Sequence, residues 1–321
     1  MADVSVRVIT WNMGESINKI SDWGKELDMW DLLEDDVDIL FMTVQEASSG
    51  LGCRFAAALK AKMGNNYKLW YDGQGTMIPF QNFHVYGFLF VKNGVSVIKP
   101  PHDGATDSVC IYKRKFGIPA CTKPSVGFGI VVAKGGKEHK LIFVGSHLPV
   151  NVDDIENNAY GLEERVEAIK TIRKDLIDDI DKEIDGHDVV FWAGDMNFRI
   201  QSNGIEQLEQ LLKGDELAGF RESSKSFDRT CRLLEYDGVS NFDEFVAKRI
   251  VGEGYDGKRT PSYCDRIIFK GSFEPTEYFS WPKPGSRYPM SIAYSDHMVV
   301  GLNGIIREPS TMAGGSGYKM K

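Results

Sequence analysis

The 321-residue sequence contains few cysteines, no surplus of positive charge and no long hydrophobic run. Its five cysteines are scattered, odd in number and without C-x-x-C spacing. This pattern excludes a disulfide framework and a cysteine-rich zinc site, and it predicts reduced thiols in a cytosolic protein. Acidic residues outnumber basic ones by 46 to 38, which gives a formal net charge of −8. Because a long track along nucleic acid needs a basic surface, this balance disfavours a nucleic-acid partner.

Targeting and membrane-spanning segments are not recognisable in the sequence either. The apolar stretches reach about eight residues, whereas a membrane-spanning helix needs about 20. Neither a signal peptide nor a prenylation box is visible, and Ala2 stands where N-myristoylation requires glycine. We therefore expect a cytoplasmic protein without a transmembrane segment. Peripheral contact with membranes stays open, because the apolar loop at 77–80 could either touch lipid or pack inward.

Composition and periodicity indicate one α/β domain. The chain has 42% hydrophobic and 26% charged residues, as globular proteins do. Short β-rich runs predict strands at 4–10, 37–44, 85–91, 126–133, 140–145, 188–193, 266–269 and 298–306. Apolar residues at helical spacing predict an amphipathic helix over 161–183, with shorter helices at 52–63 and 204–213. The Gly/Pro-rich segments 72–79, 99–104 and 282–289 are typical of loops. We expect a domain over 1–308 and a disordered tail over 309–321.

Polar residues of chemical interest stand at the ends of the apolar strands. Four strands lead into the short segments Trp11-Asn12, Gln45-Glu46, Ser146-His147 and Asp195-Met196-Asn197. Two further segments, Cys264-Asp265-Arg266 and Ser295-Asp296-His297, stand at strand starts. A strand end is a rigid mount for a catalytic group that faces a cleft, so the six segments could converge on one site.

Asp195 and Asn197 lie two residues apart behind a buried strand. If the backbone stays extended, both side chains point to the same side. A carboxylate that orients water, beside an amide that donates to a developing oxyanion, suits the hydrolysis of a phosphate ester. The alternative is a plain strand-to-loop turn, in which glycine, aspartate and asparagine are common.

Asp296 and His297 are adjacent in the sequence, and adjacent side chains on a strand point to opposite faces. Their direct pairing would need a kink. We therefore expect Asp296 to serve another part of the site or to orient a different histidine, such as His147. A purely structural role for either histidine is the alternative.

Glu46 and Asn12 are candidates for a magnesium site. Magnesium typically takes one or two carboxylates, keeps several waters and binds the substrate phosphate directly. A single glutamate with an asparagine nearby can supply these few protein ligands. No His/Cys cluster in the sequence has the spacing of a zinc site. Alternatively, Glu46 is an acidic residue at the start of a helix.

In this order, the six segments resemble the catalytic domain of the inositol polyphosphate 5-phosphatases, within the magnesium-dependent endonuclease/exonuclease/phosphatase superfamily. The family blocks WxGDxNxR and P(A/S)WCDR match residues 192–199 and 261–266, where Tyr263 replaces tryptophan. Residues 227–232 resemble a degraded F-x-P-T-Y-K block. The resemblance covers residues 5–305 and implies a single-domain, four-layer αββα sandwich with two facing mixed β-sheets.

The resemblance also implies an activity: phosphoric monoester hydrolysis that removes the 5-phosphate from inositol polyphosphates or phosphoinositides in signalling. Water would attack in line, without a phosphoenzyme. Glu46 would ligate Mg²⁺, with Asn12 close to the metal and the phosphate. Asp195 would activate the water, and Asn197 would hold the water or the phosphate.

The remaining roles implied by the resemblance concern charge. His147 and His297 would stabilise phosphoryl charge in the transition state. Asp265 and Asp296 would orient groups that touch the substrate. Arg266 would anchor either the local structure or the substrate.

The sequence departs from the family pattern where the substrate is recognised. The family's N-K-G-(G/A) block is replaced at 122–125, and only Lys123 is retained. A family Tyr-Lys pair that grips the neighbouring 4-phosphate is missing, and Arg165 is the candidate cation in that region. Lys123 and Arg165 are therefore expected to bind substrate, with plain surface charges as the alternative.

Two other functions compete with a 5-phosphatase. One is another superfamily activity, an abasic-site endonuclease or a sphingomyelinase, which the block at 261–266 and the acidic charge balance disfavour. The other is a non-catalytic phosphoinositide-binding module, which is disfavoured because four motif residues are intact: Glu46, Asp195, Asn197 and His297. We expect an inositol phosphate headgroup as the partner of a monomeric chain.

Overall fold

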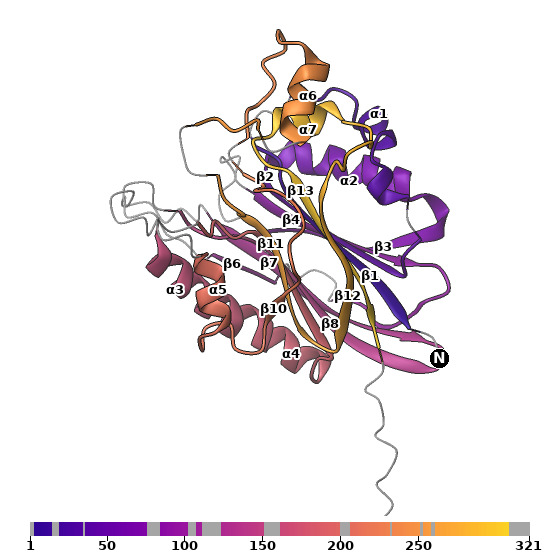
Figure 1. Cartoon of the computed structure of the whole chain (residues 1–321). Coiled ribbons are helices and arrows are strands. Elements are labelled where there is room, and N and C mark those ends of the chain that lie inside the picture. Colours follow the sequence, from indigo (N-terminus) through magenta and orange to yellow (C-terminus); the bar gives the residue numbers. More distant parts are fainter. Residues whose placement is uncertain are drawn as a thin grey trace, which may run out of the picture.

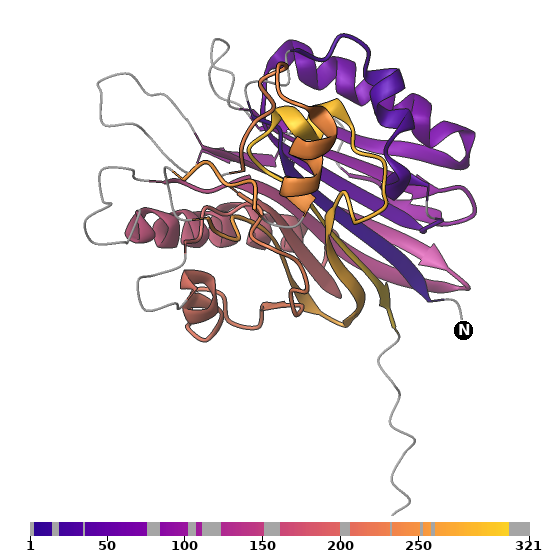
Figure 2. The same ribbon diagram turned by 45° about the horizontal axis from the view of Figure 1, so that its top comes forward.

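The computed structural model describes residues 3–14, 19–34, 36–75, 84–101, 107–110, 123–150, 161–199, 206–231, 233–250, 253–257 and 261–307. Two β-sheets face each other, and helices cover the outer face of each (Figures 1 and 2). This is the αββα sandwich that the resemblance implies, and both sheets are mixed. No helix within the described ranges is long and apolar enough to cross a bilayer.

The first sheet, called sheet A, is built from both ends of the described chain. Its strand order is β12-β13-β1-β2-β4-β3. The strands are β1 (Val4–Asn12), β2 (Ile39–Ala47), β3 (Tyr67–Gly75), β4 (His84–Lys92), β12 (Phe273–Trp281) and β13 (Val299–Ile306). Only β1 and β2 pair in parallel among these strands, so both end at the same edge.

The second sheet, called sheet B, comes from the middle of the chain. Its order is β10-β11-β9-β8-β7-β5, and β6 also pairs with β7. The strands are β5 (Ser96–Lys99), β6 (Asp107–Cys110), β7 (Pro124–Lys134), β8 (Lys137–His147), β9 (Val189–Asp195), β10 (Arg221–Glu222) and β11 (Asp265–Gly271). The parallel pair here is β8 with β9, and Ser146 and His147 lie beside Gly194 and Asp195.

Helices form the two outer layers. Sheet A is covered by α1 (Trp23–Asp28), the 3-10 turn η2 (Asp31–Leu33), α2 (Ser49–Met63), α6 (Phe242–Ile250) and α7 (Met290–Tyr294). The exposed 3-10 turn η3 (Gly64–Asn66) connects α2 to β3. Sheet B is covered by α3 (Leu162–Ile172), the π-helical turn η5 (Arg173–Ile177), α4 (Asp178–Ile184) and α5 (Gln207–Leu212). Figure 2 shows the two sets of helices on opposite sides of the sandwich.

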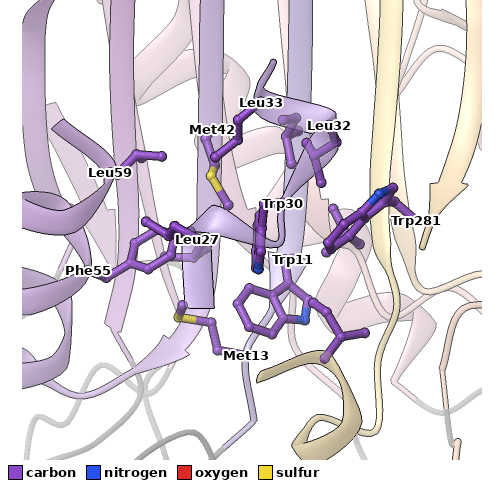
Figure 3. Close-up of a cluster of buried hydrophobic side chains, with 14 of the residues drawn as sticks. Trp11, Met13, Leu27, Trp30, Leu32, Leu33, Met42, Phe55, Leu59 and Trp281 are labelled. Carbon is purple, nitrogen blue, oxygen red and sulfur yellow. The ribbon is translucent and has the colours of Figure 1, made fainter. Parts of the chain in front are cut away.

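Buried apolar side chains fill three layers, one between the sheets and one under each set of helices. The central strands are apolar on both faces because both faces are covered. Under the helices of sheet A, Trp30 packs between Trp11 and Trp281, with ring centroids 5.3 Å and 5.1 Å apart (Figure 3). The contact with Trp11 fixes the outer layer on β1, the strand that ends in Asn12.

The eight strands expected from the sequence are all present, with ends shifted by a few residues. The helix expected over 161–183 is also present, interrupted by η5. The expectation of a loop over 72–79 is wrong for 72–75, where β3 continues to Gly75. Residues 77–80 and the tail at 309–321 lie outside the described residues. The division of the chain at residue 308 stays a prediction.

Candidate active site

The six polar segments meet at one end of the sandwich. Asn12 and Glu46 stand at the ends of the parallel strands of sheet A, and His147 and Asp195 end the parallel strands of sheet B. Asn12 Nδ2 donates to Asp195 Oδ2 at 2.9 Å, so one hydrogen bond joins the two sheets. The convergence expected from the strand ends is therefore observed.

Two glycines allow the chain to pack closely at this end. A Cβ at Gly145 of β8 would lie 2.2 Å from Thr43 Oγ1 of β2, on the other sheet. A Cβ at Gly194 would lie 2.0 Å from the carbonyl oxygen of Ser146, and Gly194 has a φ of +156°. Side chains at these positions would separate the strands that carry the site.

Asp195 and Asn197 are not arranged as an extended strand, which corrects the expectation above. Asn197 has a φ of +52°, in the left-handed region. Its backbone N–H donates to Asp195 Oδ1 at 3.0 Å, and its Nδ2 donates to the carbonyl oxygen of Leu148 at 2.9 Å. Asn197 thus holds the Asp195 carboxylate through its backbone, in the manner of an Asx turn.

His297 is oriented by Asp265 and only distantly by Asp296. His297 Nδ1 lies 2.8 Å from Asp265 Oδ2, which also accepts a hydrogen bond from Thr230 Oγ1 at 2.8 Å. His297 Nε2 lies 4.0 Å from Asp195 Oδ2 and 3.8 Å from Asp296 Oδ1. Asp265 is completely buried, so the imidazole is held by a carboxylate that solvent does not reach.

His147 is the second histidine close to Asp195 Oδ2. Its Nε2 is 3.3 Å from Asp195 Oδ2 and 3.8 Å from Glu46 Oε1. Lys123 Nζ contacts both ring nitrogens and lies 3.2 Å from Nδ1. The carboxylate closest to His147 is therefore Asp195, whereas Asp296 lies 3.8 Å from His297, not the pairing that one expectation had proposed.

Charge at the site is set by burial and by these contacts. Burial opposes ionisation of Asp195, but His147, His297 and Lys123 hold its pKa well below the usual value. Burial and the Lys123 ammonium lower the pKa of His147. Burial would also lower the pKa of His297, but Asp265 and Asp296 raise it well above 6.5. These pKa directions leave Asp195 ionised, His147 neutral and His297 protonated near neutral pH.

Glu46 and Asn12 offer oxygen atoms that fit a magnesium ion. Glu46 occupies a β-bulge of β2 with a φ of +57°, which turns its carboxylate out of the strand and leaves it 23% exposed. Asn12 Oδ1 accepts from the Gly14 N–H at 3.0 Å and has a second lone pair. No group of three or more His, Cys, Asp or Glu within the described ranges could hold a metal. A site with one carboxylate, completed by water and substrate phosphate, is typical of Mg²⁺.

Arg165 and Arg266 both make buried structural contacts, and only for Arg165 does this depart from the expectation. Arg165 is completely buried and donates to the carbonyl oxygen of Pro149 at 3.1 Å and to Gln207 Oε1 at 2.8 Å. It is therefore neither a substrate contact nor a surface charge. Arg266 Nε donates to Glu222 Oε1 at 2.6 Å, and Arg266 is 1% exposed. Of the two roles considered for Arg266, the geometry fits anchoring of the local structure.

Three residues that had no assigned role hold the site together. Arg199 Nη2 donates to Asn197 Oδ1 at 3.0 Å. Thr230 binds Asp265 as described, and Ser295 Oγ donates to the carbonyl oxygen of Asn12 at 2.7 Å. Each of these three residues belongs to a motif segment, so the sequence motifs could have indicated its importance. A motif does not show which atoms the residue contacts.

A protein-family model and several curated proteins match this chain. The model of "Endonuclease/Exonuclease/phosphatase family 2" matches residues 9–303. The human phosphatidylinositol 4,5-bisphosphate 5-phosphatase A is 25% identical over 302 residues, covering 83% of this chain and 26% of the relative. Synaptojanin of Caenorhabditis elegans is 28% identical over 234 residues, covering 67% of this chain and 18% of the relative. The chain thus spans about a quarter or less of the length of these relatives.

Solved structures share the fold at lower identity. The inositol polyphosphate 5-phosphatase domain of SPsynaptojanin, in complex with inositol (1,4)-bisphosphate and calcium ion, superposes with a TM-score of 0.61 at 19% identity, covering 95% of this chain and 84% of that chain. A Cimex nitrophorin in a ferrous NO complex reaches 0.58 at 14% identity, covering 95% and 99%. Because the fold serves such different proteins, the residues of the site must decide the function.

Proposed function

Because the chain belongs to the endonuclease/exonuclease/phosphatase family, with the motifs of the inositol polyphosphate 5-phosphatase catalytic domain, we propose that it is a magnesium-dependent phosphatase that removes the 5-phosphate from inositol polyphosphates or phosphoinositides. The observation that carries the proposal is the hydrogen bond from Asn12 to Asp195. It joins two sheets and places one ionised carboxylate within 4.0 Å of two histidines.

In the proposed mechanism, water attacks the 5-phosphorus in line, and the bond from that phosphorus to the inositol oxygen breaks. The attacking water loses a proton and the leaving inositol oxygen gains one, so the products are inorganic phosphate and an inositol hydroxyl. Asp195 orients the water, because a carboxylate with a strongly lowered pKa accepts a hydrogen bond well but is a weak base. The protonated His297 stabilises the charge on the phosphoryl oxygens, and Asp265 keeps it protonated and aligned. Asn197 holds Asp195 from behind.

Glu46 and Asn12 would hold Mg²⁺. When bound, the ion supplies Lewis-acid polarisation of the phosphate and neutralises part of its charge. A divalent ion is also supported by the solved 5-phosphatase domain, which carries calcium. Direct attack of water agrees with the chemistry of the described site, which offers carboxylates, imidazoles and hard oxygen ligands around the reaction centre.

The substrate class is inferred from relatives and from charge. The human relative is named for phosphatidylinositol 4,5-bisphosphate, and the synaptojanin domain holds inositol (1,4)-bisphosphate, which carries no 5-phosphate. Lys123, whose Nζ lies 3.2 Å from His147 Nδ1, would bind a substrate phosphate. We propose that the chain acts as a cytoplasmic monomer, in contact with membranes when the substrate is a lipid.

Phosphate release tests the proposal. Purified protein is incubated with inositol 1,4,5-trisphosphate, or with vesicles that contain phosphatidylinositol 4,5-bisphosphate, with Mg²⁺ or with EDTA. We expect release that EDTA abolishes and that Asp195→Ala lowers by about 1,000-fold or more. Asp179→Ala, on the exposed face of α4, is the control and should behave as the wild type. Full activity in EDTA, or nicking of an abasic duplex in place of phosphate release, would refute the proposal.

Glu46→Gln tests the metal site separately. Loss of the carboxylate should raise the Mg²⁺ concentration needed for half-maximal activity, with partial recovery at high Mg²⁺. An unchanged Mg²⁺ requirement would show that Glu46 is not a ligand.

A further inference from the structure

Two buried cysteines lie in contact directly behind the candidate active site. Cys231 and Cys264 are both free thiols with no exposed surface. Their sulfur atoms are 2.8 Å apart, whereas a disulfide bond is about 2.05 Å long. The proposed hydrolysis uses neither thiol, so a pair this close needs another explanation.

The backbone holds the two cysteines in place from several sides. Cys231 forms isolated β-bridges with Ser262 on one side and with His297 on the other. The Cys231 N–H donates to the carbonyl oxygen of Ser262 at 3.2 Å. Because Ser262 is two residues before Cys264, this pairing brings the two side chains together without a change in the surrounding chain.

A cation lies beside the first of these thiols. Arg199 Nη1 donates to Cys231 Sγ at 3.3 Å. Burial would raise the pKa of Cys231, but the hydrogen bond with Cys264 and the charges of Arg199 and His297 lower it. Burial and the same hydrogen bond raise the pKa of Cys264 well above its usual value. The pair thus consists of one activated thiol and one thiol that keeps its proton, as in many redox-active pairs.

We propose that Cys231 and Cys264 form a reversible disulfide that switches the site off. Because neither sulfur is exposed, the oxidant must be small, and hydrogen peroxide is the class that fits. The Cys231 thiolate attacks the peroxide O–O bond, giving a sulfenic acid and releasing one water after protonation. Cys264 then attacks the Cys231 sulfur, which releases the second water. Overall, two thiols lose two electrons and two protons, and one peroxide becomes two waters.

The disulfide would act on the site through the neighbours of the two cysteines. Thr230 precedes Cys231, and Asp265 follows Cys264. Thr230 Oγ1 donates to Asp265 Oδ2, which orients His297. Disulfide formation would draw the two sulfur atoms together by about 0.8 Å and move Cys231 Sγ away from Arg199 Nη1. These movements would displace the hydrogen bonds that connect Thr230, Asp265 and His297. This effect on catalysis rests on the proposed function, whereas formation of the disulfide does not.

Peptide mapping tests the disulfide itself. The full chain is treated with hydrogen peroxide, unreacted thiols are blocked in denaturant, and trypsin is added. We expect a linked pair of peptides, residues 230–232 with 260–266, that is two hydrogens lighter than its parts and separates on reduction. A triple variant, Cys53→Ser with Cys110→Ser and Cys121→Ser, should give the same pair. The absence of this pair in both folded proteins would overturn the proposal, whether or not either hydrolyses any phosphate.

Activity measurements test the switch. Peroxide should lower phosphate release by about tenfold or more in the wild type and the triple variant, since small displacements at a reaction centre have large effects. Dithiothreitol should restore it. Cys231→Ser and Cys264→Ser, each compared with its own untreated sample, should lose this response, and Cys53→Ser should keep it. A linked pair without loss of activity, or a loss that survives in Cys231→Ser, would overturn the switch.

Discussion

Asp265→Asn removes the charge that holds His297 while keeping the shape of the side chain. The carboxylate accepts from His297 Nδ1 and from Thr230 Oγ1, each at 2.8 Å, and no solvent reaches it. A hydrogen bond to a charged group contributes about 1.5–3 kcal/mol. If that contribution is lost from the transition state, kcat falls by about 10- to 150-fold. KM should change little, because Asp265 does not face the substrate.

The pH dependence makes this prediction specific. Burial raises the pKa of Asp265 to about 6, against the opposing effect of His297. The pKa of His297 is raised well above 6.5, so the charged pair exists from about pH 6 up to the raised pKa of His297. In Asp265→Asn, the acid limb near pH 6 should disappear. The alkaline limb should move to lower pH, because His297 loses the carboxylate that keeps it protonated.

The assay is kcat for phosphate release between pH 5 and pH 9, with Asp296→Asn as the matched control. Asp296 Oδ1 is 3.8 Å from His297 Nε2 and the side chain is 17% exposed, so its loss should have a clearly smaller effect. Equal losses in the two variants, or an unchanged alkaline limb in Asp265→Asn, would refute the assignment of Asp265 as the residue that orients His297.

Three further predictions concern stability and are checked by chemical unfolding. The ion pair of Glu222 with Arg266 holds the pKa of Glu222 below 4.5 against burial, so its stabilisation is present above pH 4.5 and is lost as the pH falls through the folded-state pKa. Glu222→Gln should therefore lower the free energy of unfolding by about 3–5 kcal/mol at pH 7 and by less at pH 3, and an equal loss at both would contradict this. Arg165→Met should lower the free energy of unfolding by about 1–3 kcal/mol, because the buried acceptors at Pro149 and Gln207 lose their donor. KM should stay unchanged, and a raised KM with normal stability would show that Arg165 binds substrate after all. Gly194→Ala should cost about 3 kcal/mol or more, whereas Gly186→Ala, with a φ of +91° but open space around it, should cost only about 1–2 kcal/mol. Similar losses at the two glycines would show that the contact with Ser146 is unimportant.

The central strands and their polar ends were predictable because their residues obey local rules. Strands buried on both faces appear as continuous apolar runs, and β9 (Val189–Asp195) is one of them. The edge strands β3 (Tyr67–Gly75) and β12 (Phe273–Trp281) mix polar with apolar residues, and β12 contains a proline, so neither was recognised. The short helices α1 (Trp23–Asp28) and α7 (Met290–Tyr294) have too few turns to show a periodicity.

At the site, residue types were predictable but partners were not. The motifs marked Asp265 and His297, yet only the fold shows that these two pair while Asp296 stands aside. Arg165 was expected to contact substrate because it is the candidate cation in the region where the family's Tyr-Lys pair is missing. Its actual acceptors, at Pro149 and Gln207, are brought to it by the fold.

The chain order of sheet A sets when the site can exist during synthesis. Val4 of β1 pairs with Ile306 of β13, and β13 lies between β1 and β12. His297 stands just before β13, so a ribosome-bound chain that has finished sheet B still lacks one residue of the candidate site. Pairing over such sequence separations is slow, and β1 must wait with an unpaired edge until β13 emerges. On the proposed function, a nascent chain therefore gains activity only after β13, the last strand within the described ranges, has closed the sheet.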